Sequence, residues 1–317
     1  QRIVFTEGDN YRILKAAEIL INNGVAKPIL LGSKEKMAAI IEEYQLELQE
    51  AEFIDVTTDS AGREEYAAQM YEFRKRRGWT MGECRSKIKS REYYGNMMLR
   101  DGAADALISG LTVKYPTALR PILRIIGMEE GMRKAAGMYI LLSKRGPMFF
   151  ADTTINLDPT VEDLVQMVLN VADTVKRTNI TPKVALLSYS NFGSSNGPDA
   201  RKMAQASSIL RKEHPDLIVD GEMQANFALE PELLKESFPF SDLVGHQANV
   251  FIFPNLAAGN ITYKMLQSFG AAEAIGPMLI GTKSSAHVLQ LGASVREIVN
   301  MATLAAVDAR NRKVKKG

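Results

Sequence analysis

The chain is poor in the residues that build disulfides and metal centres. Its 317 residues include one cysteine, Cys84, and three histidines, His214, His246 and His287. A single cysteine cannot form an internal disulfide or a thiolate zinc site, and no two of the histidines have the spacing of metal ligands. We therefore expect no metal site, and a chain without disulfides fits the reducing cytoplasm.

Long apolar runs and an excess of one charge are also missing. No stretch reaches the roughly 20 apolar residues that span a bilayer, so we expect no membrane partner. The net charge is +2, which argues against nucleic acid as the main partner. One basic run stands at the end of the chain, and we interpret it as a solvated helix end rather than a binding patch. It consists of Arg310, Arg312, Lys313, Lys315 and Lys316.

Motifs for nucleotide phosphates are absent as well. No Gly-x-Gly-x-x-Gly follows a strand, and there is no Gly-x-x-x-x-Gly-Lys-Ser/Thr loop. The chain cannot carry dinucleotide-dependent oxidation by itself.

What is present is an alternation of short β-branched runs with helical stretches. This order predicts an α/β fold with mostly parallel sheets and helices on both faces. The expected strands are 2–5, 28–32, 53–56, 106–109, 184–188, 217–219, 250–253 and 287–289. The clearest expected helices are 11–21, 61–75, 160–177 and 200–212.

Two segments depart from this alternation. Residues 138–143 and 147–151 are extended runs separated by a short Gly-containing loop, which predicts an antiparallel hairpin near the start of a second lobe. Ser294 and Glu297 have the spacing of a capping box, which predicts the start of the last helix. We expect its apolar face to consist of Val295, Ile298, Val299, Ala302 and Ala306.

A Gly-x-Ser-x-Gly pattern occurs around Ser195 at residues 193–197. In serine hydrolases this pattern forms a sharp turn directly between a strand and a helix. Here the expected strand ends several residues earlier, so we favour an ordinary loop. A Ser195 hydrolase that uses His246 or His287 as its base is the weaker interpretation.

The loop at residues 188–194 follows an apolar strand and precedes a helix, a position at which open α/β sheets bind ligands. Its hydroxyls, its glycine and its backbone N–H groups could hold an anion. Composition alone leaves an ordinary polar loop equally open.

Six segments, taken in chain order, resemble motifs of the phosphate acetyl/butyryl-transferase family. The similarity runs from about residue 2 to residue 310 and covers essentially the whole chain. The segments are Arg74-Lys75 with Gly78-Trp79-Thr80, Leu119-Arg120-Pro121, Ser188 to Ser194, Asp220 to Gln224, Pro254 to Lys264, and Gly276 to Gly281.

The resemblance implies two α/β lobes of the isocitrate/isopropylmalate dehydrogenase type with a cleft between them. The first lobe would be 1–133 plus 282–317, the second 134–281, and the last helix would return to the first lobe. Coenzyme A or acetyl-CoA would bind in the cleft through Arg74 and Arg120, and the chain would form a homo-oligomer. Further ligand-binding positions implied are Ser188, Ser190, Gly193, Ser194, Glu222, Gln224, Asn260, Tyr263 and Lys264.

The positions that carry the family's chemistry are altered. Gln290 stands where the family has the serine, and Leu291 where it has the arginine, of its phosphate-binding pair. Loss of that arginine removes a charge-assisted contact to phosphate. Glu297 aligns with the family's catalytic aspartate, although a capping box already explains a glutamate there. Phe192, Asn226 and Ala257 also replace residues that are common in the transacetylases.

A retained ligand site with altered phosphate chemistry resembles the C-terminal domain of bacterial NADP-dependent malic enzymes, and the start at Gln1 would fit an excised domain. NADP and a divalent metal would then belong only to N-terminal malic enzyme domains outside this chain. We expect a regulatory domain that binds acetyl-CoA. The alternative is an active phosphate acetyltransferase that takes phosphate or acetyl phosphate and uses Glu297 as its base.

Overall fold

The computed structural model describes residues 1–314, so Lys315 and Lys316 of the basic run lie outside the described residues. The chain forms two compact units. Unit 1 contains residues 1–129 and the chain from Thr282 onward, and unit 2 contains Glu130–Gly281. The sequence predicted that the first lobe would end at residue 133 and the second would begin at residue 134. In the structure the chain passes from unit 1 to unit 2 between Glu129 and Glu130. Glu129 still belongs to unit 1, where it pairs with Arg312 at 2.5 Å.

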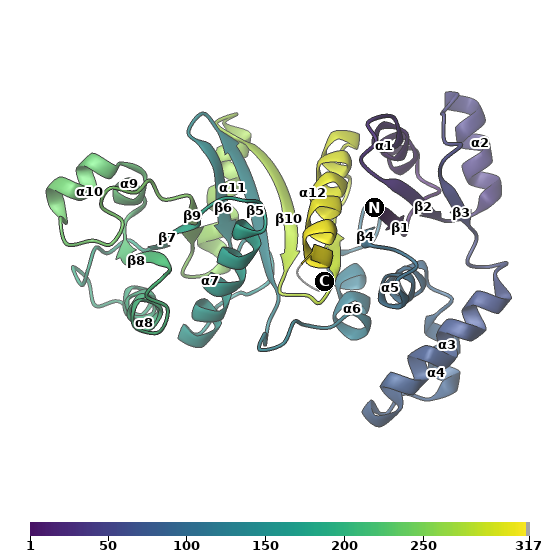
Figure 1. The fold of residues 1–317 in the computed structure, drawn as a ribbon, viewed down its shortest axis with the longest axis horizontal. Helices are drawn as coiled ribbons and strands as arrows, with labels where there is room; N and C mark the ends of the chain where they lie inside the picture. Colours follow the sequence, from purple (N-terminus) through teal and green to yellow (C-terminus); the bar gives the residue numbers. More distant parts are fainter. Residues whose placement is uncertain (315–317) are drawn as a thin grey trace. The chain divides into compact units, whose positions relative to one another are not determined.

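Unit 1 is built on a five-stranded parallel sheet with the order β11-β4-β1-β2-β3. Its helices cover both faces: α1 and α12 lie on one side, and α5 and α6 on the other (Figure 1). The strands are β1 (Arg2–Phe5), β2 (Lys27–Leu31), β3 (Glu52–Ile54), β4 (Ala106–Ser109) and β11 (Ser285–Val288). The helices are α1 (Tyr11–Asn22), α2 (Lys34–Tyr44), α3 (Ser60–Arg74), the 3-10 turn η1 (Lys75–Arg77), α4 (Met81–Lys87), α5 (Arg91–Asp101), α6 (Tyr115–Ile125) and α12 (Val295–Val314).

Unit 2 is built on a six-stranded mixed sheet with the order β10-β5-β6-β9-β7-β8. Strand β5, next to the edge strand β10, pairs antiparallel with both β10 and β6, and the remaining pairs are parallel. The strands are β5 (Ala136–Ser143), β6 (Gly146–Ala151), β7 (Lys183–Leu187), β8 (Ile218–Met223), β9 (Val250–Ile252) and β10 (Glu273–Ile280). The helices are α7 (Val161–Lys176), α8 (Pro198–Glu213), α9 (Ala225–Leu229), α10 (Pro231–Ser237) and α11 (Leu256–Ser268).

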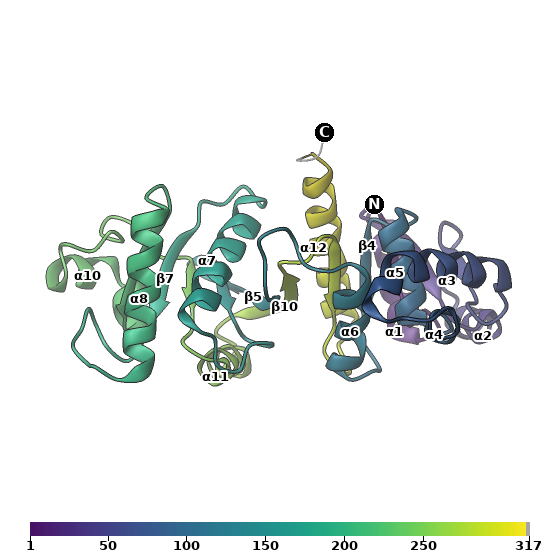
Figure 2. The ribbon, with the colours of Figure 1, turned by 90° about the horizontal axis from the view of Figure 1, so that it is seen from below.

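The sheet of unit 2 has a core on each face. Helices α7 and α8 lie side by side against one face (Figure 2). Tyr139 and Leu141 of β5 point to the other face, where they join the buried cluster of Tyr263, Ala228 and Leu234 from α11, α9 and α10. Because side chains alternate along a strand, one short apolar run supplies both cores.

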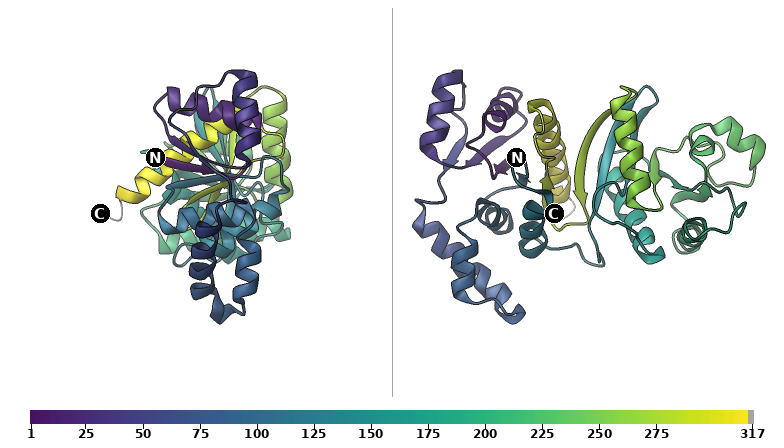
Figure 3. Two further views of the ribbon diagram at one scale, coloured as in Figure 1. Left: turned by 90° about the vertical axis from the view of Figure 1, so that its right-hand side faces the viewer. Right: turned by 180° about the vertical axis from the view of Figure 1, so that it is seen from behind.

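The main expectations about the elements are confirmed. The two extended runs form the β5–β6 hairpin, in which Ser143 stands opposite Gly146. The last helix belongs to unit 1 and packs beside α1 (Figure 3). Within residues 1–314, no helix is both long and apolar enough to cross a membrane.

The capping box before α12 is also present. The Glu297 carboxylate accepts a hydrogen bond from the Ser294 backbone N–H at 2.8 Å, and the Ser294 hydroxyl accepts one from the Glu297 N–H at 3.3 Å. The expected apolar face is only partly right, because Val295 and Val299 are half-buried. The buried face consists of Ile298, Met301, Ala302, Ala305, Ala306, Asp308 and Ala309.

Arg310, Arg312 and Lys313 lie in α12, as expected, but the Arg312 side chain is only 15% exposed and is not solvated as expected. Arg312 bonds Asp308 one turn earlier at 2.8 Å as well as Glu129, and Lys313 bonds Asp105 at 2.9 Å. These cations therefore hold α12 to unit 1.

Candidate functional site

The loop between β7 and α8 in unit 2 is organised around a buried carboxylate. Glu222, the last residue but one of β8, is 2% exposed. Its Oε1 accepts hydrogen bonds from the Ser190 hydroxyl at 2.9 Å and from the Gly193 N–H at 2.7 Å. The two strands are parallel neighbours, so their carboxyl ends bring this loop and Glu222 together, as the sequence indicated for a ligand-binding edge.

Several other polar groups of the loop are used inside the loop. The Ser194 hydroxyl accepts from the Asn191 N–H at 2.9 Å, and the Ser190 hydroxyl accepts from the Ser195 N–H at 3.0 Å. Ser188 Oγ accepts from the Ser190 N–H at 3.2 Å. An anion approaching this loop would therefore compete with Glu222 and with the loop's own acceptors. The hydroxyls are gathered as the sequence suggested, but one of them, that of Ser190, donates to the protein's own carboxylate.

The remaining ligand positions of unit 2 have structural contacts. Gln224 donates from its side chain to the Tyr189 carbonyl at 2.8 Å, and Asn260 donates to the Thr153 carbonyl at 3.0 Å. Tyr263 is buried and stacks on Tyr139, with ring centroids 4.0 Å apart. Lys264 is exposed, with its Nζ 5.3 Å from the Tyr263 ring centroid.

The arrangement around Ser195 does not match a hydrolase elbow. Strand β7 ends at Leu187 and α8 begins at Pro198, so residues 188–197 separate them. His287 lies elsewhere, buried on β11 of unit 1 and hydrogen-bonded to Ser285 Oγ at 3.0 Å.

In unit 1, the altered positions lie on a firmly held loop. A buried glutamate, Glu7, accepts hydrogen bonds from the backbone N–H groups of Gly110, Leu111 and Thr112 at 2.6–2.9 Å and thereby fixes the loop after β4. The loop after β11 bonds to this segment through the Gly292 N–H and the Leu111 carbonyl at 3.1 Å.

The side chains that this loop exposes are an amide and an apolar group. Gln290 is exposed, and Leu291 has an apolar side chain that is 61% exposed. The Glu297 carboxylate is bonded to both the N–H and the hydroxyl of Ser294 at 2.8 Å. The loop therefore carries no guanidinium at positions 290 and 291, and the Glu297 carboxylate serves as a helix cap.

A cluster of cations in unit 1 is the feature best suited to an anionic ligand. Arg74, at the end of α3, is 8% exposed, and its Nε atom is buried without a hydrogen-bond partner. Its guanidinium carbon lies 5.3 Å from the ring centroid of Trp79. Lys87 and Arg124 lie at 5.2 and 5.7 Å from the same ring. We call Arg74, Arg77, Lys87, Arg100 and Arg124 the arginine cluster.

The contacts of the arginine cluster are neutral rather than acidic. Arg124 donates to the Tyr93 hydroxyl at 3.1 Å, and Arg100 donates to the Ile125 carbonyl at 2.9 Å while lying 3.9 Å from the Phe73 ring centroid. Burial lowers the pKa of Arg74, and the neighbouring Arg77, Arg124 and Arg100 lower it further. An anion placed here would relieve both the desolvation and the repulsion.

Arg74 was expected from the sequence, whereas the rest of the cluster was not. Arg120, the second expected arginine, is exposed on α6, one turn before Arg124. The other members come from η1, α4, α5 and α6, and each resembles an ordinary surface cation in the sequence. The one available sign was Trp79, the only tryptophan, among many basic residues.

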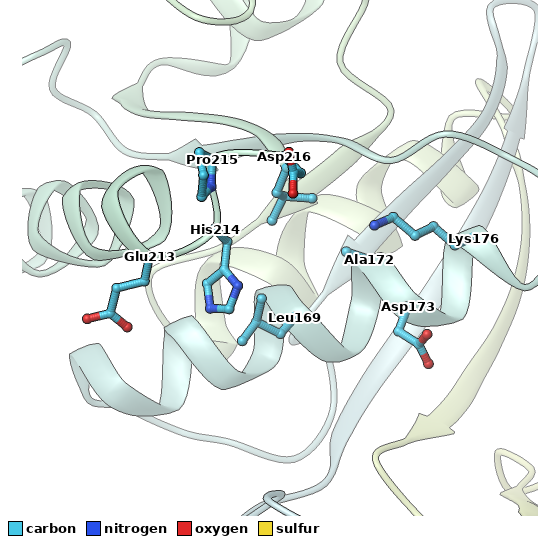
Figure 4. Close-up of a pocket in the computed structure, with 9 residues that line it drawn as sticks. Leu169, Ala172, Asp173, Lys176, Glu213, His214, Pro215 and Asp216 are labelled. Atoms are coloured by element: carbon cyan, nitrogen blue, oxygen red, sulfur yellow. The ribbon is translucent and has the colours of Figure 1, made fainter.

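A cavity of about 310 Å³ in unit 2 lies apart from these residues. It is formed at the C-terminal ends of α7 and α8, where His214 lies beside Leu169 and Lys176 lies further along α7, near Ala172 (Figure 4). This is the opposite edge of the sheet from Glu222, because β7 and β8 begin there. None of the residues that the sequence predicted as site residues lines this cavity. Within residues 1–314, no group of three or more His, Cys, Asp and Glu side chains could hold a metal ion.

Comparison with known proteins identifies the fold and the family. The chain is 39% identical to the NADP-dependent malic enzyme of Salmonella typhimurium over 314 residues, which is 98% of this chain but 41% of that protein. It is 35% identical to the phosphate acetyltransferase of Clostridium acetobutylicum, covering 98% of this chain and 95% of that protein.

Solved structures agree with these sequence relatives. A phosphotransacetylase from Streptococcus pyogenes superposes with a TM-score of 0.91 at 33% identity, covering 98% of this chain and 94% of the other. The EutD phosphotransacetylase from Staphylococcus aureus gives 0.89 at 30% identity, covering 97% and 94%. The family model described as phosphate acetyl/butaryl transferase matches residues 1–306. The chain therefore belongs to the phosphate acetyl/butaryl transferase family.

Proposed function

We propose that this chain is a ligand-binding domain that holds acetyl-CoA and regulates a malic enzyme, with acyl transfer impaired. The observation that carries the proposal is the buried, unpaired Arg74 within the arginine cluster. Burying a cation without an anionic partner costs free energy. A fold that holds a buried arginine without an anionic partner is well suited to bind an anion from solution.

Coenzyme A supplies the matching chemistry. It carries phosphate groups, which guanidinium groups bind through paired, charge-assisted hydrogen bonds. The cluster offers guanidinium groups from three different helices, Arg74 on α3, Arg100 on α5 and Arg124 on α6. A ligand with more than one phosphate could contact several of them at once.

Acyl transfer to or from phosphate is disfavoured by the other part of unit 1. Leu291 offers no donor where a phosphate-binding arginine would be needed. Loss of one preorganised donor typically lowers a rate by about 10²–10³-fold. Glu297 is committed to Ser294 and would have to leave the cap before it could accept a proton from a thiol.

The regulatory role rests on the length of the relatives. The chain spans about two fifths of the malic enzymes that it matches. Malate oxidation, NADP and a divalent metal would belong to the rest of such a protein. Regulation requires that acetyl-CoA bind two states of the whole protein with different affinity, so malate should in turn change the affinity for acetyl-CoA.

The binding claim is tested by replacing Arg74. Trp79 is the only tryptophan and touches the cluster, so its fluorescence reports on the site directly. In Arg74→Met we expect acetyl-CoA affinity to fall at least about 10-fold, because a charge-assisted contact to phosphate is lost. The variant should stay folded, since it replaces a buried unpaired charge with an apolar side chain of similar length.

The matched control is Arg85→Met on α4, an exposed arginine that pairs with Glu64 on the surface of the same unit. Its affinity for acetyl-CoA should equal that of the unchanged chain. Equal binding by the Arg74 variant and the unchanged chain would rule out the arginine cluster as the ligand site.

An active phosphate acetyltransferase is the second candidate, favoured by the 35% identity to free-standing enzymes of nearly the same length. It predicts that the chain forms acetyl-CoA from acetyl phosphate and coenzyme A, and that Glu297→Gln abolishes this activity. Absence of thioester formation at high protein concentration would exclude this candidate.

A further inference from the structure

The cavity at the C-terminal ends of α7 and α8 has an apolar floor. Leu169 and Ala172 lie on the same side of α7, and Leu217 completes the floor from the segment that leads into β8. Ala172 is buried, and both leucines are half-buried. The volume of about 310 Å³ is at the lower end of the range of ligand pockets, which suits a small molecule rather than a nucleotide.

Two charged groups of opposite sign stand at the rim of this cavity. Lys176 follows Ala172 by four residues on α7, and Asp216 lies just after α8. In Figure 4 the Lys176 side chain extends from α7 in the direction of Asp216. Among residues 1–314, neither side chain has an ion-pair partner within 4.0 Å. Both groups are therefore available to a ligand.

The backbone that carries Asp216 is a closed β-turn. The His214 N–H donates to the Leu210 carbonyl at 2.8 Å, so the turn continues directly from the last turn of α8. The Leu217 N–H donates to the His214 carbonyl at 3.0 Å and closes the turn. Pro215 occupies the second position of the turn, where its fixed φ is favoured. The cavity is thus bounded by a helix and by a hydrogen-bonded turn, so its shape is preorganised.

The other acidic residues of the lining are placed differently. Asp173 accepts a hydrogen bond from Arg177 Nε at 2.9 Å, so its charge already has a partner. The Glu213 carboxylate points away from Lys176 and Asp216 in Figure 4. One cation and one anion therefore remain to face a ligand above the apolar floor.

We propose that this cavity binds a small α-amino acid with an apolar side chain. The Lys176 ammonium would donate to the carboxylate of the ligand, and the Asp216 carboxylate would accept from its amino group. The apolar side chain of the ligand would cover Leu169, Ala172 and Leu217 and leave water. A plain anion would be repelled by Asp216, and a plain amine would be repelled by Lys176, so a ligand with both charges fits best.

This site is separate from the proposed acetyl-CoA site. The cavity lies in unit 2, whereas the arginine cluster belongs to unit 1. An amino acid bound in the cavity would leave the arginine cluster free, so the proposal does not depend on acetyl-CoA binding.

The test is a calorimetric titration of the 317-residue chain with L-leucine and with two analogues that each lack one charge. 4-Methylpentanoate has no amino group, and 3-methylbutylamine has no carboxylate. We expect saturable binding of leucine with a dissociation constant below about 1 mM. Each analogue should bind at least about 10-fold more weakly, because one charge-assisted contact is lost and one repulsion takes its place.

Two substitutions locate the binding. Lys176→Met and Asp216→Asn should each lower the affinity for leucine at least about 10-fold, because each removes one charge-assisted contact. Both residues are exposed, so thermal unfolding should be nearly unchanged. The matched control is Lys212→Met, an exposed lysine in the last turn of α8 that does not line the cavity. Its affinity for leucine should equal that of the unchanged chain.

Four results would overturn the proposal. The first is the absence of saturable binding up to about 10 mM leucine. The others are an analogue that binds as tightly as leucine, cavity variants that keep the affinity of the unchanged chain, and an equal loss of affinity in the Lys212 variant.

Discussion

Leu291 is an exposed apolar side chain on a loop whose backbone is firmly held. The loop that carries it is bonded to the segment fixed by Glu7, as a phosphate-binding loop would need. The exposed leucine cannot donate a hydrogen bond to an anion, which supports our proposal that acyl transfer is impaired. In contrast, Arg74 retains its chemistry, because a guanidinium without a partner remains buried among like charges.

His287 provides a prediction about pH. Its imidazole is buried on β11, and burial lowers its pKa to about 4. In the unfolded chain the same imidazole has a pKa near 6.5 and binds a proton below that pH, whereas in the folded chain it stays neutral down to about pH 4. The free energy of unfolding therefore falls as the pH falls below about 6.5. Between pH 7 and 5 this loss should amount to about 2 kcal/mol of unfolding free energy.

Urea unfolding of His287→Gln between pH 7 and pH 5 measures the contribution of this histidine to the loss of unfolding free energy. The variant should lose less stability than the unchanged chain on going to pH 5, whereas His214→Gln, at a partly exposed helix end, should show the full loss. If the free energy of unfolding fell equally with pH in the His287 variant and in the unchanged chain, this histidine would not be the cause of the loss of stability in acid.

At the scale of elements, the position of α11 depends on a missing side chain. A methyl group at Gly259 would approach the Asp152 carbonyl oxygen to 2.4 Å, and that oxygen belongs to backbone, which cannot move aside cheaply. We expect Gly259→Ala to lower the free energy of unfolding by about 2 kcal/mol or more, despite the better helix propensity of alanine.

Gly82 in α4 is the matched control, because its Cβ would have only the Thr80 hydroxyl within reach, at 3.9 Å. Gly82→Ala should be neutral or stabilising by up to about 1 kcal/mol. Thermal unfolding of both variants compares the two positions. Stabilisation by both substitutions would contradict the close packing of α11.

Helices that begin with a capping residue could be predicted from the sequence. Thr160 and Ser294 begin α7 and α12 through hydrogen bonds to residues three positions on, so the helix starts could be predicted from spacing alone. Strand β8 was predicted too short, because Asp220, Gly221 and Glu222 do not resemble a strand. The hydrogen-bond partners of the buried Glu222 carboxylate, Ser190 and Gly193, lie about thirty residues earlier in the chain.

The candidate site was predictable only in part, for the same reason. Arg74 lay within a recognisable motif, whereas Lys87, Arg100 and Arg124 join it only through the packing of α3 to α6. No periodicity relates residues on four different elements. The buried, unpaired state of Arg74, which carries the functional proposal, is a property of the folded unit.

At the scale of the whole molecule, the central claim is that the chain binds acetyl-CoA as a ligand. The most direct measurement is a calorimetric titration of the 317-residue chain with acetyl-CoA. We expect a saturable isotherm with one site per chain and a dissociation constant well below about 1 mM, as several charge-assisted contacts to phosphate would give. No saturable heat up to millimolar acetyl-CoA would contradict the account.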